Sequence, residues 1–244
     1  MHSFYLDAPG AVGQVAALPK DEAKHAAKVL RLREGDAVCA LDGAGGRFSA
    51  EVVRAQGERV ELRLTAELPP NEPPVRLTVY PGLPKSDKLE FMVQKLTELG
   101  AAACVPVVMA RSVARPDARD GEKRRERLER IAREAAKQCR RARPAEVDAP
   151  LDWPRALERM AGHELLIVPW EGAGSLRMGE LRAECPGAKD IAIAVGPEGG
   201  ISEEEVAALR AHGARVVTLG PRILRAETAV VASAALAMAL WGDL

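Results

Sequence analysis

The chain contains 244 residues, 47% of them hydrophobic, and its 35 basic side chains balance 35 acidic ones. This composition is typical of a folded protein of one or two domains and excludes a disordered or fibrous chain. The sequence has no apolar run long enough to cross a bilayer and no signal-peptide pattern, so we expect a cytoplasmic protein without membrane contact. The four cysteines and four histidines are scattered, which predicts neither a disulfide framework nor a metal site.

Short β-prone segments with partly alternating polarity occur at residues 36–43, 46–53 and 58–65. They predict a small β-barrel over residues 1–69, with one helix near residues 21–30. At helical spacing, His25, Lys28 and Arg31 lie near one another. Three basic groups on a small barrel suit a module that contacts RNA, although a single histidine is more often structural.

The stretch LPPNEPP has four prolines in seven residues, which disfavours both a helix and a central strand, so we place a linker at residues 70–75. After it, apolar strands alternate with helices, the pattern of a parallel sheet covered by helices. We therefore expect an α/β domain over residues 76–244. Its expected strands span residues 75–80, 103–109, 164–170, 191–195 and 214–219.

Two long helices are expected in this second domain. The first runs from Ser86 to Gly100, with a capping-box pattern formed by Asp87 and Glu90. The second spans residues 121–141, with an apolar stripe on one side and basic residues on the other.

The charges are unevenly distributed, because 13 basic but only six acidic residues lie between Arg111 and Arg143. A local basic surface on a protein of zero net charge indicates a polyanionic partner such as RNA. The alternative is a solvated helix face whose arginines pair with glutamates one turn away.

Two loops that follow expected strands and lead into helices are candidates for ligand binding. One is GPEGG, residues 196–200, before a helix with Ser202 as its N-cap, and the other is LGPRILRAET, residues 219–228. Loops at the carboxyl ends of parallel strands line a ligand crevice, and glycines there expose the backbone. The pair suits a nucleoside-bearing cofactor. Alternatively, the glycines only make tight turns and Glu198 is an exposed loop acid.

The glycine-rich segments do not favour a dinucleotide-binding site. DGAGGRF, residues 42–48, lies between two expected strands and predicts a hairpin. EGAGSLRMG, residues 171–179, follows a strand but has Arg177 in place of the third glycine of G-x-G-x-x-G. We therefore disfavour NAD binding.

Five segments of the chain together carry a family resemblance: HAAKVLRLREGD, KSDKLEFMVQKLTELG, EAAKQCRRARPAEV, AVGPEGGISEEE and LGPRILRAETAVVASAAL. Over essentially the whole chain they resemble the RsmE family of 16S ribosomal RNA uracil-N3 methyltransferases. The resemblance implies an N-terminal PUA-like β-barrel and a C-terminal SPOUT methyltransferase domain with a deep trefoil knot. It also implies a homodimer, S-adenosylmethionine as methyl donor, and a uridine near the decoding centre of 16S rRNA in the small ribosomal subunit as acceptor.

The resemblance also assigns residues, because backbone groups of the knot hold the cofactor in such enzymes. The implied cofactor-binding residues are Pro169, Trp170, Gly196, Pro197, Glu198, Gly199, Gly200, Leu219, Gly220, Ile223, Leu224, Arg225 and Thr228. The positions expected near the RNA are Arg111, Ser112, Gln138, Arg140, Arg141 and Arg143.

Methyl transfer to uracil N3 requires in-line approach and the loss of the N3 proton. A carboxylate can accept this proton, and an arginine can stabilise the negative charge that develops on the uracil. Glu198 and Glu227 are the candidate carboxylates. Arg111, Arg222 and Arg225 are the candidate cations. Alternatively, Glu227 only caps the last helix and Arg225 pairs with an acid.

Because N3 lies on the base-pairing edge, the target uridine must be unpaired when it is modified. Two other functions remain open on the sequence. One is a SPOUT enzyme that methylates a ribose 2′-oxygen, and the other is a non-catalytic RNA-binding assembly factor. The two intact glycine loops argue against the assembly factor.

Overall fold

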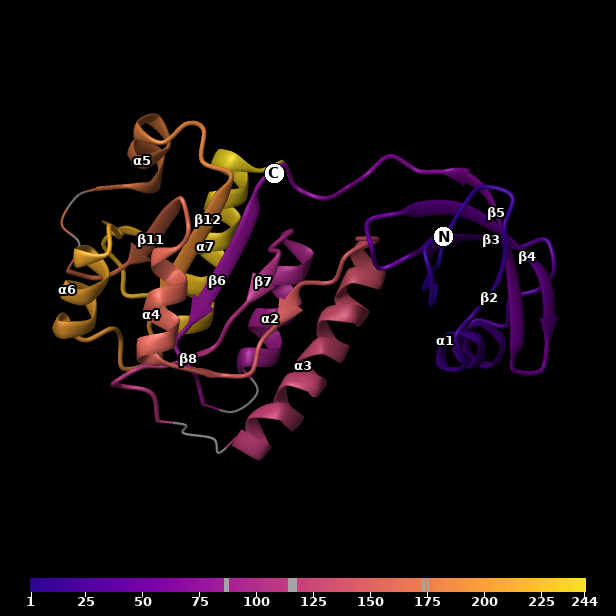
Figure 1. Ribbon diagram of the computed structural model, residues 1–244, viewed down its shortest axis with the longest axis horizontal. Coiled ribbons are helices and arrows are strands. Elements are labelled where there is room, and N and C mark those ends of the chain that lie inside the picture. The colour runs from indigo at the N-terminus through magenta and orange to yellow at the C-terminus, as the bar shows by residue number, and fades with distance from the viewer. Residues whose placement is uncertain (86–87, 114–117, 173, 175) are drawn as a thin grey trace. The chain divides into compact units, whose positions relative to one another are not determined.

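The computed structural model (Figure 1) describes residues 1–85, 88–113, 118–172, 174 and 176–244. The chain divides into two units. Unit 1 contains Met1–Glu72 and Arg133–Pro144, and unit 2 contains Pro73–Ala132 and Ala145–Leu244. Residues 133–144 thus group with the N-terminal part although they follow the proline-rich segment. Within the described part of the chain, no helix is long and apolar enough to span a bilayer.

Unit 1 is built on a five-stranded sheet with the order β1-β3-β4-β5-β2. The strands are β1 (Ser3–Tyr5), β2 (Val15–Ala17), β3 (Ala37–Leu41), β4 (Arg47–Gln56) and β5 (Arg59–Glu67). Only the β1–β3 pair is parallel. The alternating apolar residues of these strands form one core, in which Phe4, Val38 and Leu62 are completely buried.

The expected helix near residues 21–30 is present in a modified form. It begins as α1 (Lys20–Lys24) and continues as a single π-helical turn, η1 (His25–Val29). Arg31 then adopts a positive φ of 53°, which ends the helix. The segment DGAGGRF joins the antiparallel strands β3 and β4, so the predicted hairpin is confirmed.

The segment 133–144 is anchored in unit 1 by both packing and polar contacts. Ala136 packs with Tyr5, Cys39 and Leu41 in a small buried cluster. The Tyr5 hydroxyl donates a hydrogen bond of 2.9 Å to the Arg141 carbonyl oxygen. The Arg133 guanidinium lies 4.8 Å from the centroid of the Tyr5 ring, a cation–π distance.

Unit 2 contains a six-stranded sheet with the order β13-β11-β12-β6-β7-β9, in which every pair is parallel. The strands are β6 (Arg76–Pro81), β7 (Ala103–Cys104), β9 (Glu146–Val147), β11 (Leu165–Pro169), β12 (Asp190–Val195) and β13 (Arg215–Val217). The predicted parallel α/β architecture is therefore confirmed.

The strand expected at residues 103–109 is interrupted. Its first part, β7, belongs to the large sheet, whereas β8 (Val107–Val108) pairs with β10 (Leu151–Asp152) in a separate two-stranded sheet. Pro106 lies between the two parts, and a proline has no N–H to donate to a sheet. Its carbonyl oxygen instead accepts a hydrogen bond from Leu151 N.

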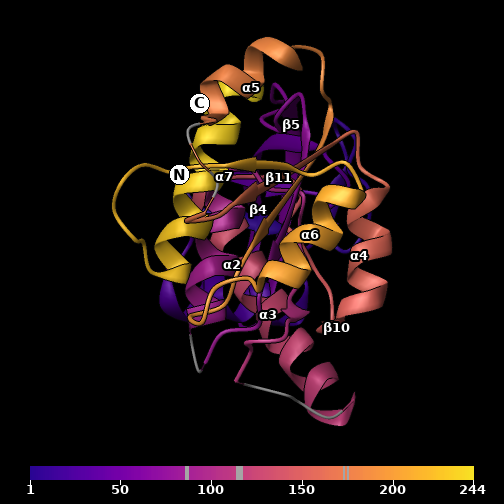
Figure 2. The ribbon, with the colours of Figure 1, turned by 90° about the vertical axis from the view of Figure 1, so that its left-hand side faces the viewer.

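Helices cover both faces of the large sheet, and Figure 2 shows α2 and α7 on one side with α4 and α6 on the other. The helices of this unit are α2 (Lys88–Glu98), the first part of α3 (Ala118–Cys139), α4 (Trp153–Ala161), α5 (Met178–Glu184), α6 (Glu203–Ala211) and α7 (Ala226–Trp241). Alternate strand residues separate the two cores: Val79 packs toward α2 and α7, and Tyr80 toward α4 and α6. Ser86, the expected first residue of α2, and Asp87 of the expected capping box lie outside the described residues.

Candidate functional site

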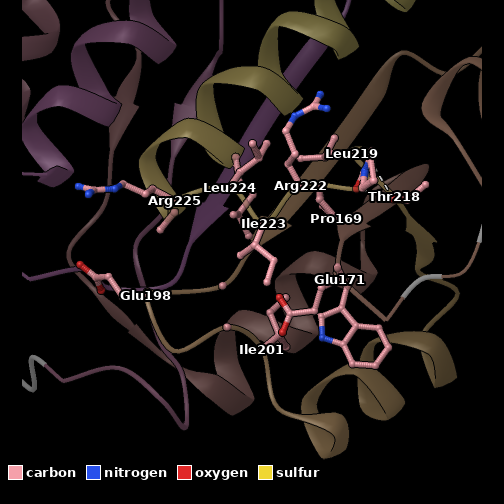
Figure 3. Close-up of a pocket in the computed structure, with 18 of the residues that line it drawn as sticks. Pro169, Glu171, Glu198, Ile201, Thr218, Leu219, Arg222, Ile223, Leu224 and Arg225 are labelled. Carbon is pink, nitrogen blue, oxygen red and sulfur yellow. Dashed lines mark hydrogen bonds between the residues drawn. The ribbon is translucent and has the colours of Figure 1, made fainter.

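Three loops at one end of the unit 2 sheet surround a cavity of about 1190 Å³ (Figure 3). They leave the carboxyl ends of the neighbouring strands β11, β12 and β13, where ligands bind in open parallel sheets. The lining includes Lys88, Pro169, Trp170, Glu171, Val195, Gly196, Pro197, Glu198, Gly200, Ile201, Leu219, Gly220, Arg222, Ile223, Leu224 and Arg225.

The cavity brings together most of the residues that the sequence analysis assigned to a cofactor. Pro169 and Trp170 come from the first loop, residues 196–198 and Gly200 from the second, and residues 219–220 and 223–225 from the third. Gly199 belongs to the second loop and Thr228 to the first turn of α7, and neither lines the cavity.

The GPEGG loop is held in shape by the start of α6. Ser202 accepts a hydrogen bond from Glu205 N, and the Glu205 carboxylate accepts one from Ser202 N. The predicted N-cap is therefore confirmed. A Cβ on Gly196 would lie 2.7 Å from Gly200 C and Ile201 N, and Gly200 has a φ of +75°. The loop folds back on itself so tightly that both positions require glycine.

Gly199 faces Arg111 and not the cavity. A Cβ on Gly199 would approach the Arg111 Cβ to 2.9 Å, and Arg111 Nη1 donates a hydrogen bond of 3.0 Å to the Gly199 carbonyl oxygen. Glu205 Oε1 accepts a hydrogen bond from Ala110 N. The segment that carries Arg111 is therefore fixed against the GPEGG loop, and Ser112 is buried beside it.

A lysine that the sequence analysis did not single out links the two candidate carboxylates. Lys88 Nζ lies 3.1 Å from Glu198 Oε1 and 3.3 Å from Glu227 Oε2. Lys88 begins α2, which follows the carboxyl end of β6. One sequence feature could have identified this lysine: it is a basic residue within the segment KSDKLEF, which follows an expected strand and so lies at this edge of the sheet.

These contacts change the ionisation of the groups involved. Burial opposes ionisation of Glu198, but hydrogen bonds from its own backbone, from Lys88 and from Lys85 N outweigh burial and lower its pKa. The pKa of Lys88 is raised chiefly by its hydrogen bond to Glu198, against desolvation and with further help from Glu227. Both groups are therefore charged at neutral pH.

The arginines of the third loop reach different parts of the site. Arg225 precedes α7 as its N-cap residue but makes no side-chain capping bond, and Figure 3 shows the Arg222 and Arg225 side chains extending in different directions from the loop. Glu227 lies in the first turn of α7, where a negative charge is favourable.

The residues expected near RNA have different environments. In unit 1, His25, Arg31, Gln138 and Arg140 are exposed, and Lys28 is exposed but paired with Glu58 at 2.7 Å. Arg141 is buried and pairs with Glu72 at 2.7 Å. The Arg143 guanidinium donates to the Ala44 carbonyl oxygen. The guanidiniums of Arg141 and Arg143 are thus engaged within unit 1.

Within the described ranges, no group of three or more His, Cys, Asp or Glu side chains is arranged to hold a metal ion. The cavity is lined by charged side chains of both signs, among them Lys88, Glu198 and Arg225, together with glycines and apolar residues.

Two family models match the chain. The RNA methyltransferase domain matches residues 71–238, and the RNA methyltransferase PUA domain matches residues 18–65. Ribosomal RNA small subunit methyltransferase E of Bacillus subtilis (strain 168) is 36% identical over 86% of this chain and 84% of that protein. The protein of the same name from Mycobacterium bovis (strain ATCC BAA-935 / AF2122/97) is 37% identical over 93% of this chain and 87% of that protein.

A solved structure is also similar over the full length. Ribosomal RNA small subunit methyltransferase E from Neisseria gonorrhoeae, bound to S-adenosyl methionine, superposes with a TM-score of 0.89 at 32% identity, covering 100% of this chain and 99% of that one. Fold, site and family models together define an RNA methyltransferase that carries a PUA domain. The chain belongs to the ribosomal RNA small subunit methyltransferase E family, as its sequence resemblance to the RsmE family indicated.

Proposed function

We propose that this chain transfers the methyl group of S-adenosylmethionine to N3 of an unpaired uridine in the 16S rRNA of the small ribosomal subunit. The observation that carries the proposal is the cavity at the carboxyl ends of β11, β12 and β13, with glycine-containing loops on three sides. It lies in a chain whose relative from Neisseria gonorrhoeae was solved bound to S-adenosyl methionine.

The residues of the cavity fit such a cofactor. Val195, Ile201 and Leu224 supply apolar surface for a nucleoside. Gly200 and Gly220 line the cavity and have no side chain, so a ligand could approach their backbone closely. Glu171 and Glu198 line the cavity and would provide negative charge to a cationic sulfonium bound there.

The cofactor would supply an electrophilic methyl group and leave as a neutral thioether. The loops of this chain would hold it through the backbone of Gly196, Gly200, Leu219 and Gly220. The walls would exclude water and fix the direction of approach, which supplies much of the rate enhancement in a displacement reaction. Thr228 would support the third loop from outside the cavity lining.

The charged residues then have distinct tasks. During transfer the N3–H bond breaks and its proton passes to a carboxylate or to water, while negative charge spreads over N3 and the two carbonyl oxygens. Arg222, Arg225 or Arg111 would stabilise that charge. The lowered pKa of Glu198 makes its carboxylate a weak base that stays ionised. We therefore assign Glu198 chiefly to electrostatic attraction of the positively charged cofactor. Glu227 is the alternative proton acceptor.

We further propose that residues 1–69 form a PUA-like β-barrel that binds RNA, that residues 70–75 are a linker, and that residues 76–244 form the catalytic SPOUT domain. The exposed His25, Lys28, Arg31, Gln138 and Arg140 would contact the phosphate backbone.

The sheet order, with β12 between β6 and β11, supports a chain crossing of the trefoil-knot type.

The last helix supports a homodimer. Between Glu227 and Asp243 the chain carries no charged residue, and Leu236 on the outer side of α7 is 43% exposed. A helix that is apolar all round is normally buried. A second copy of the chain, in the cytoplasm where small subunits are assembled, would cover it.

The proposal is tested by calorimetric titration with S-adenosylmethionine, followed by transfer of a radiolabelled methyl group to small subunits isolated from a strain that lacks the enzyme. Cofactor binding and label in 16S rRNA are expected. The absence of cofactor binding would favour a non-catalytic assembly factor. Label confined to other RNAs would contradict the proposed substrate.

A further inference from the structure

Lys88 connects three segments of unit 2 that are distant in the sequence. Its ammonium group lies at the start of α2, Glu198 belongs to the loop after β12, and Glu227 belongs to the first turn of α7. Lys88 and Glu198 line the cavity, whereas Glu227 is not among the lining residues. The lysine therefore connects the cavity wall to the last helix.

The three charges are held in a partly screened environment. The side chains of Lys88, Glu198 and Glu227 are 32%, 30% and 19% exposed. Glu227 Oε2 is buried and has no hydrogen-bond partner among the described residues, so its attraction to the lysine 3.3 Å away is electrostatic. Without the lysine, two carboxylates would face each other and repel.

We propose that Lys88 is a positioning residue of the methyl-transfer site, whose ammonium group holds Glu198 and Glu227 together so that the Glu198 carboxylate stays charged and fixed at the cavity wall. This inference rests on the proposed function, because it assigns Lys88 a task in that reaction. It adds to the site a residue that lies outside the glycine loops and acts through the two glutamates.

The charged groups around Glu198 come from several elements. Lys88 of α2 favours its ionised form, Glu227 of α7 disfavours it, and the backbone N–H of Lys85 donates to its Oε1 at 3.3 Å. Arg225 lines the same cavity, and Arg111 bonds to the adjacent Gly199. Among the residues that the structure describes, Lys88 is the cation in ion-pair contact with both carboxylates. Its removal should therefore change the net charge around Glu198 most.

The test compares Lys88→Met and Lys88→Arg with Lys95→Met. Lys95 is the matched control, because it lies on the same helix, is also 32% exposed, and pairs with Glu98 away from the cavity. Three quantities are measured from pH 5 to pH 8: the rate of methyl transfer to small subunits, the affinity for S-adenosylmethionine, and the titration of Glu198. The titration is followed by NMR of carbon-13-labelled glutamate and assigned with Glu198→Gln.

In Lys88→Met, Glu198 should titrate at a higher pH than in the unmodified protein. The transfer rate should fall about twofold or more at pH 5, where part of the Glu198 population is protonated, and return to the unmodified value at pH 8, where the carboxylate is ionised again. Lys88→Arg should restore the unmodified profile, and Lys95→Met should not alter it. A lysine with only a structural role would lower the rate equally at every pH.

An unchanged Glu198 titration in folded Lys88→Met would overturn the inference, as would a pH-independent loss of rate. The NMR titration does not depend on catalysis. A shifted titration in a protein that transfers no methyl group to RNA would support the Lys88 contact while contradicting the proposed function. Normal methyl transfer with an unshifted Glu198 titration would support the proposed function while contradicting the role of Lys88.

Discussion

Arg111 Nη1 donates a hydrogen bond of 3.0 Å to the carbonyl oxygen of Gly199. The two residues also pack closely, because a Cβ on Gly199 would lie 2.9 Å from the Arg111 Cβ and 3.4 Å from its carbonyl oxygen. The glycine therefore permits close packing between the GPEGG loop and the segment before α3. A residue assigned to RNA and a residue assigned to the cofactor thus depend on each other.

Gly199→Val should displace the loop from Arg111 and weaken S-adenosylmethionine binding by about tenfold or more, since the added side chain collides with neighbouring atoms. The effect is indirect, because Gly199 does not line the cavity. Calorimetry measures the affinity. Gly179→Ala is the control, because a Cβ there meets nothing within 4 Å. Equal affinity in Gly199→Val and the unmodified protein would contradict the packing role.

Glu72→Gln should destabilise unit 1 by about 3 kcal/mol, because it removes the negative charge that pairs with the buried Arg141 guanidinium at 2.7 Å. The Arg141 side chain is only 6% exposed, and the Glu72 carboxylate also accepts from Arg143 N. Urea unfolding measures the loss. Arg59→Gln breaks the more exposed pair with Glu61 and should cost less than about 1 kcal/mol. Similar losses in both variants would show that Arg141 is not a structural residue.

The two tyrosines should resist ionisation in alkaline solution. Burial raises the pKa of Tyr80 to about 12, against the effect of Arg159 and with help from Asp148 and Asp190. Burial also raises the pKa of Tyr5, against the effect of Arg133. Because the unfolded chain loses these protons first, stability should fall as the pH rises from 10 toward 12.

Absorbance of tyrosinate measures this directly, with far-ultraviolet circular dichroism to follow unfolding. The signal should appear only above the range of a free tyrosine or together with unfolding. Tyr80→Phe should remove half of the tyrosinate absorbance, because the chain has two tyrosines. A tyrosine that titrates near pH 10 in the folded protein would contradict the burial of its hydroxyl.

Arg140→Gln should weaken binding to a 16S rRNA fragment and reduce the salt dependence of affinity by about one unit of slope, as expected for one lost phosphate contact. Arg140 is exposed, unlike its neighbour Arg141. Fluorescence anisotropy at several salt concentrations measures both effects. Arg155→Gln, an exposed arginine on α4, is the control. An unchanged slope would remove Arg140 from the RNA surface.

Leu236→Glu should convert a dimer into a monomer, because it places a charge in the apolar outer side of α7. Leu236 is 43% exposed in the single chain. Sedimentation velocity gives the mass at micromolar concentration. Val29→Glu, in unit 1, is an equally large change at an exposed position and should leave the mass unchanged. A monomer before any substitution would contradict the proposed dimer.

The sequence predicted those features that depend on local patterns. Alternating strands and helices predicted the parallel sheet, and Ser202 with Glu205 predicted the start of α6. The GPEGG and LGPRILRAET loops were placed at the sheet edge because each follows an apolar strand. These signals arise from residues within a few positions of one another.

The features that sequence reasoning missed depend on distant contacts or on competing local effects. The contact between Lys88 and Glu227 joins residues that are 139 positions apart, and no local pattern shows it. Arg141 counted as one of many basic residues, yet Glu72 and Tyr5 bury it in unit 1. The break in the strand at residues 103–109 had a local cause in Pro106, which the apolar run obscured.

The central claim is that the methyl group is attached to uracil N3 in 16S rRNA. Small subunits from a strain that lacks the enzyme are incubated with this protein and S-adenosylmethionine, and the 16S rRNA is digested to nucleosides for mass spectrometry. The proposed function predicts that N3-methyluridine appears in the digest. It should be absent from reactions without the cofactor and from reactions with Glu198→Gln that are analysed at early times. A 2′-O-methylated nucleoside, or no methylated uridine at all, would contradict it.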